Sequence, residues 1–117
     1  MTEAERALLT EIAESIEYWA QLIVSETKGQ AQFSWAMRPE SIKSITTLAK
    51  VNGLEKELGD FAYEILYGFA HSILVAFDGG SKLADKFPLE IHTSHGTQLC
   101  KYLHELLPDI RAEREEN

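Results

Sequence analysis

The stretch from Tyr63 to Asp85, YEILYGFAHSILVAFDGGSKLAD, decides the fold of this 117-residue chain. It contains the longest run without a charged residue, Ile65 to Phe77, which is followed at once by an aspartate and two glycines. Apolar residues occupy most sides of a helix drawn through this run, a pattern typical of a helix that is buried on most sides. The double glycine is typical of a helix C-terminus. We therefore predict a central apolar helix that begins near Leu54 and ends at the glycines.

Gly68 lies inside this predicted helix. A glycine there costs roughly 1 kcal/mol of helix propensity relative to Ala. Because glycine has no side chain, it also permits another helix to approach closely. We expect a helix–helix contact at this position.

The N-terminal segment predicts a long amphipathic helix. Thr2 and Glu5 match a capping box, in which a hydroxyl and a carboxylate satisfy the free amides at a helix start. Gly29 is a natural stop for this helix. Its apolar residues follow at helical spacing and are Leu8, Leu9, Ile12, Ile16, Trp19 and Ile23.

The remaining segments predict further helices and little extended structure. The expected elements are a loop, turn or short strand over 30–38, a helix over 39–51, a short helix over 81–86, an extended segment over 89–92, and a last helix over 97–107. Thr97 can cap this last helix, and Pro108 kinks or ends it unless residues 109–116 open one more helical turn. The predicted fold class is all-α, a single compact bundle of four to five helices with at most a minor strand pair.

Length and composition favour one soluble domain. We expect a single helical domain over residues 1–117, with a frayed tail over 111–117. The apolar run is shorter than the roughly 20 residues that span a bilayer. The acidic N-terminus lacks the features of a signal peptide, and the single cysteine suits a reducing compartment. The expected location is the cytoplasm, with no membrane association.

The net charge of −8 bears on the kind of partner. Binding to nucleic acid is disfavoured because phosphate contacts need a clustered basic surface. A basic protein partner is favoured because opposite fields accelerate encounter, although the charge could serve solubility alone. The candidate partner-binding residues are acidic positions of the first helix and two aromatics of the irregular segment: Glu3, Glu11, Glu14, Glu17, Phe33 and Trp35.

Histidines supply the alternatives that involve chemistry. A metal site could be formed by His92, His95, Cys100 and His104, since zinc accepts such nitrogen and sulfur ligands. The lone cysteine lacks the paired spacing of structural zinc sites, so the preferred interpretation has neither metal nor cofactor. His71, with Tyr67 and Glu64 on broadly the same side of its helix, could act as a general acid or base. A structural role for His71 in the core is the more usual explanation.

The block from Phe69 to Asp85, FAHSILVAFDGGSKLAD, is similar in character to blocks in small bacterial proteins. The chain shows no nucleophile elbow, zincin motif, phosphate loop or dinucleotide fingerprint. A small acidic helical chain of this kind resembles bacterial immunity proteins, such as those of contact-dependent growth inhibition systems. The resemblance implies a protein that binds a toxin domain and blocks its active site.

The predicted function is therefore a small acidic binding protein that neutralises a partner protein, with a toxin nuclease domain as the implied partner. One alternative is a small metal- or histidine-dependent enzyme. Another is a helical homodimer with a structural or regulatory role.

Overall fold

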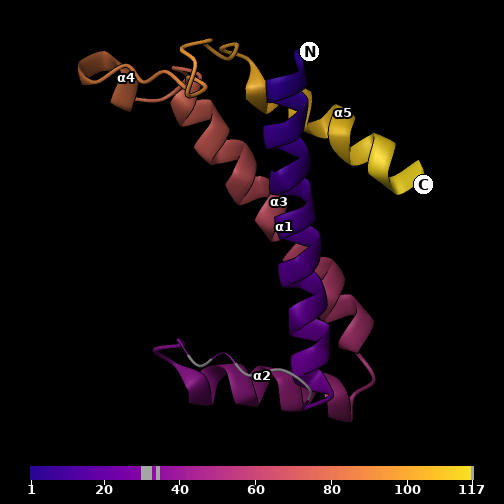
Figure 1. Ribbon diagram of the computed structural model, residues 1–117. Coiled ribbons are helices and arrows are strands. Elements are labelled where there is room, and N and C mark those ends of the chain that lie inside the picture. Colours follow the sequence, from indigo (N-terminus) through magenta and orange to yellow (C-terminus); the bar gives the residue numbers. More distant parts are fainter. Residues whose placement is uncertain (30–32, 34, 117) are drawn as a thin grey trace. The chain divides into compact units, whose positions relative to one another are not determined.

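The computed structural model describes residues 1–29, 33 and 35–116 (Figure 1). Within these residues the chain is all-α, as predicted, and its only β-structure is an isolated bridge between His92 and Gln98. None of the described helices is long and apolar enough to cross a membrane. The five helices are α1 (Glu3–Thr27), α2 (Pro39–Val51), α3 (Glu55–Phe77), α4 (Leu83–Lys86) and α5 (Leu103–Glu116).

Backbone contacts group the described residues into two compact units. Unit 1 contains Met1–Ser15 and residues 67–116, and unit 2 contains Ile16–Leu66. The two long helices, α1 and α3, each contribute residues to both units. A single domain over residues 1–117 stays a prediction.

The core of unit 1 is formed where α1 and α5 pack together. Its largest buried side chains come from Leu9 of α1 and from Leu103, Leu107 and Ile110 of α5, each with no more than 2% of its surface exposed. Polar contacts join the same two helices at their surface. The Arg6 guanidinium lies 2.7 Å from Glu113, so the last turns of α5 are held against α1.

The N-terminus of α1 is closed by the predicted capping box. The Thr2 amide donates to Glu5 Oε1 over 2.9 Å, and the Glu5 amide donates to Thr2 Oγ1 over 3.2 Å. The second Glu5 oxygen accepts the Cys100 amide over 2.8 Å. Hydrogen bonds from the Thr2 and Cys100 amides outweigh burial and lower the pKa of this carboxyl, which is only 4% exposed. Glu5 therefore joins the start of α1 to the chain that precedes α5.

The last helix differs from its prediction at both ends. It begins at Leu103 rather than at Thr97, because Thr97 pairs with Thr93 in a turn. Pro108 lies inside α5 and does not end it, so the helix continues over residues 109–116, as the alternative allowed. Fraying of the tail stays a prediction; α5 extends as far as Glu116, and residue 117 lies outside the described residues.

The start of α5 is fixed by a residue far away in the sequence. The Asp78 carboxylate, at the end of α3, accepts the His104 amide over 2.9 Å. An acceptor at this place satisfies one of the free amides of a helix N-terminus and suits the positive end of the helix dipole. Asp78 is thus an N-terminal cap for α5 as well as the residue that follows α3.

The expectation that α3 is buried on most sides is wrong. The helix buries Ala62, Tyr67 and Leu74. Four other large side chains are exposed: in unit 2 Phe61 by 65% and Ile65 by 57%, and in unit 1 Phe69 by 63% and Ile73 by 43%. The helix therefore leaves large apolar side chains open to solvent in each unit.

The predicted close approach of a helix occurs at a different glycine. A Cβ added to Gly68 would meet no atom within 4 Å. At Gly59, by contrast, a Cβ would lie 2.5 Å from Val24 Cγ2 of α1. Gly59 is therefore the position in unit 2 where α3 and α1 approach closely.

Candidate functional site

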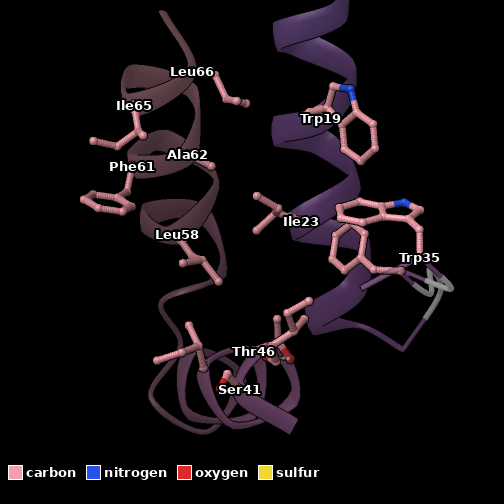
Figure 2. A pocket seen from close by; sticks show the side chains of 13 residues that line it. Trp19, Ile23, Trp35, Ser41, Thr46, Leu58, Phe61, Ala62, Ile65 and Leu66 are labelled. Carbon is pink, nitrogen blue, oxygen red and sulfur yellow. Dashed lines mark hydrogen bonds between the residues drawn. The ribbon is translucent and has the colours of Figure 1, made fainter. Parts of the chain in front are cut away.

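Unit 2 contains an apolar groove of about 680 Å³ that opens to solvent (Figure 2). Among the described lining residues none is titratable, and the polar side chains are those of Ser41 and Thr46. The groove can therefore bind apolar groups. Its lining residues are Trp19, Ile23, Phe33, Trp35, Ser41, Ile42, Ile45, Thr46, Leu58, Phe61, Ala62, Ile65 and Leu66.

One wall of the groove is an aromatic cluster. The Trp19 ring of α1 is stacked with Phe33 at a centroid distance of 6.4 Å, and the Trp35 ring meets it edge-on at 5.6 Å. Phe33 and Trp35 are themselves 5.6 Å apart. The structure thus brings together the two aromatics that the sequence singled out, although Trp35 stays 66% exposed.

The floor of the groove is α2. Thr46 is buried there, and its hydroxyl donates to the Ile42 carbonyl over 2.9 Å within the same helix. This internal hydrogen bond satisfies the Thr46 hydroxyl without any contact to a ligand. The other floor residues are Ser41, Ile42 and Ile45.

The second wall is the first half of α3. Figure 2 shows Leu66 turned toward the side of Trp19 and Ile23, whereas Phe61 and Ile65 project from the other side of α3. Those two residues therefore form the outer edge of the groove. Sequence reasoning missed the groove because it assigned Trp19 and α3 to a closed core.

The acidic candidate residues are divided between the two units. Glu3, Glu11 and Glu14 are exposed residues of unit 1, and Glu14 is 3.6 Å from the Arg114 guanidinium. Glu17 is half-buried and belongs to unit 2 with Phe33 and Trp35. The six predicted partner-binding residues thus divide between the units, three in each.

The metal alternative gains no geometric support. In the described part of the chain there is no group of three or more His, Cys, Asp or Glu side chains that could hold a metal ion. His92 Nε2 lies 2.9 Å from Glu90, and His104 Nδ1 lies 2.6 Å from Asp78. Burial raises the pKa of the Cys100 thiol, which keeps it in the form that binds metals poorly.

His71 has a neighbour that the sequence did not indicate. Its ring lies 5.4 Å from the His104 ring in an edge-on arrangement. His104 in turn contacts Asp78, whose side chain is only 2% exposed. The buried Asp78–His104 pair was missed because its members are far apart in the sequence and Asp78 was read only as part of a helix stop.

Comparisons with known proteins do not place the chain in a family. No family model matches it, and neither a curated protein nor a solved structure is significantly similar to it. The geometry of the groove and the charge of the chain are therefore the observations on which a function is proposed.

Proposed function

We propose that the chain is a small acidic binding protein that neutralises a partner protein, and that the groove of unit 2 receives apolar side chains of that partner. The observation that carries this proposal is the groove itself, which is open, apolar and walled by aromatic rings. Large exposed apolar surface with a concave shape is typical of a protein interaction site.

The shape of the groove favours a protein segment over a small ligand. Small-molecule sites bury about 70–90% of their ligand, whereas this groove is open along one side. Trp35 is largely exposed beside it, and tryptophan is enriched among residues that dominate binding energy at interfaces. An amphipathic helix laid along the groove is the recognition mode that fits a surface formed by three helices.

The charge of the chain supports a basic partner. The net charge is −8, and most of the acidic residues belong to unit 1. Exposed carboxylates such as Glu3 and Glu11 would attract a basic surface and raise the rate of association. The finer proposal is that this partner is a toxin domain, which would make the chain an immunity protein. It is supported by the acidic charge and by the resemblance of a small acidic helical chain to bacterial immunity proteins.

Co-purification and titration test the proposal. The chain should form a stable complex at low salt with the product of the neighbouring gene, and Trp35→Ala should weaken that complex by about 2 kcal/mol, or about 30-fold. The matched control is Tyr102→Ala, since Tyr102 is a 51% exposed aromatic outside the groove.

Two results would overturn the assignment of the groove. One is a complex that Trp35→Ala and Tyr102→Ala affect equally. The other is a small apolar molecule that copurifies with the chain, is seen by native mass spectrometry and is lost in the Trp35→Ala variant. A failure to form any complex with the neighbouring gene product would count against the toxin partner.

A further inference from the structure

The α3 wall of the groove carries the residue pattern of one side of a helix pair. Leu58, Phe61 and Ile65 line the groove and follow one another at intervals of three and four residues. This is the spacing of the apolar a and d positions of a heptad, the seven-residue repeat of helices that pack side by side. All three residues belong to unit 2. We call them the seam, since a second helix can pack along them.

Two glutamates flank the seam. With Leu58 and Ile65 at a and Phe61 at d, Glu57 and Glu64 occupy successive g positions, directly beside the seam. Both glutamates are exposed residues of unit 2. Positions seven residues apart are separated by two helical turns, or about 10.5 Å along the helix axis. The wall thus presents two carboxylates at the spacing at which a facing helix repeats its own side chains.

The positive charge in this part of α3 does not neutralise the flank of the seam. The Lys56 ammonium lies 2.7 Å from the Asp60 carboxylate, and in the same register these residues occupy the outward positions f and c. Glu64 already takes part in an interaction within the chain. Because an ionised carboxylate offers about four acceptor sites, that interaction leaves capacity for a cation. The flank of the seam is therefore acidic.

We propose that the groove binds an amphipathic helix of the partner that carries two cationic residues, seven positions apart, beside its apolar stripe. This inference rests on the proposed function and names the recognition element of the partner. Opposite charges at the positions that flank the seam of two packed helices set the choice of partner and its orientation. Each cationic residue meets one of Glu57 and Glu64, while the apolar stripe enters the groove.

The same charges disfavour a second copy of this segment as the occupant. In an antiparallel pair of identical helices, g positions face g positions, so glutamates would face glutamates. Like charges placed opposite one another at an interface suppress the pairing. In a parallel pair Glu57 would face Ala62, which offers no positive charge. A helix with arginine or lysine at the matching positions satisfies both glutamates.

The gain from the two charge pairs is small and depends on salt. An exposed ion pair strengthens an interaction by about 1.5- to 5-fold, so two pairs contribute about 2- to 30-fold at low salt. At about 0.5 M salt the Debye length falls to about 4 Å, and most of this gain should disappear. The apolar contacts in the groove supply the remaining affinity, which salt should not weaken.

Two model peptides test the inference. Both are helices of about 18 residues with the same composition, a stripe of leucines and two arginines seven positions apart. In the first peptide the arginines lie beside the stripe, and in the second they lie on the opposite face. The first peptide should bind more tightly by about 2- to 30-fold in about 50 mM salt, as isothermal titration calorimetry would measure. The two affinities should converge at about 0.5 M salt.

Two double variants locate the charges. Glu57→Gln combined with Glu64→Gln should abolish the difference between the two peptides. The matched control is Glu3→Gln combined with Glu11→Gln, which removes the same net charge from exposed residues of unit 1 and should preserve that difference. Circular dichroism and urea unfolding verify that both double variants remain folded.

Each contrary result identifies the step that failed. Equal binding of the two peptides, or a difference that both double variants reduce equally, would overturn the pair of cationic residues and leave the groove proposal standing. If neither peptide binds at about 1 mM, a helix of this pattern is not the occupant, while co-purification still tests the proposed function. Peptide binding that Trp35→Ala does not weaken would place the helix outside the groove and count against the proposed function itself.

Discussion

Replacement of Gly59 by alanine tests the packing of α3 on α1 in unit 2. An alanine Cβ at this position would lie 2.5 Å from Val24 Cγ2, far inside the usual carbon–carbon contact of about 3.5–4.0 Å. Val24 is β-branched and therefore has little rotameric freedom within a helix. The two helices must separate, or Val24 must leave its preferred rotamer.

Two opposing contributions determine how much Gly59→Ala changes the free energy of unfolding. Alanine gains about 1 kcal/mol of helix propensity over glycine, and forced overpacking costs typically about 1–3 kcal/mol. Gly68→Ala provides the control, because it brings the same gain in the same helix without any contact within 4 Å. The propensity contributions cancel in this comparison. Gly59→Ala should therefore be less stable than Gly68→Ala by about 1–3 kcal/mol.

Urea unfolding measures the difference in the free energy of unfolding between the two variants. The free energy of unfolding falls by about 1–2 kcal/mol per molar urea. The urea midpoints of Gly59→Ala and Gly68→Ala should therefore differ by roughly 1 M. Val24→Ala removes the clashing methyl group, so the double variant with Gly59→Ala should show a favourable coupling of similar size. Equal midpoints for Gly59→Ala and Gly68→Ala, or no coupling in the double variant, would refute the close approach.

Three further predictions concern unit 1. Glu5→Gln should destabilise the fold by about 1–3 kcal/mol at pH 7. Because the pKa of Glu5 is lowered in the folded state, the difference in stability between wild type and variant should shrink as the pH falls from about 4.5 toward 3. Urea unfolding at both ends of this pH range measures the change. Asp78→Ala should cost about 1–2 kcal/mol in thermal unfolding and speed amide exchange at His104, whereas Asp109→Ala on the exposed surface of α5 should do neither. Cys100 should react with iodoacetamide at neutral pH at least about tenfold more slowly than in urea, since burial raises its pKa.

Local signals in the sequence were sufficient for the helices and for their simplest ends. The capping box of Thr2 and Glu5 spans three residues, so the pattern alone predicts both hydrogen bonds. Gly29 follows α1 with a φ of 70°, as expected for a helix stop. The start of α5 was not predictable in the same way. It depends on Asp78, whose distance in sequence leaves no local pattern.

The groove was missed for a different physical reason. A dense apolar helix can be covered by its own chain or by another molecule, and the hydrophobic effect is the same in both cases. The apolar character of Phe61 and Ile65 does not indicate whether α1, α2 or another molecule covers these side chains. Only the exposed fractions in the fold distinguish these possibilities.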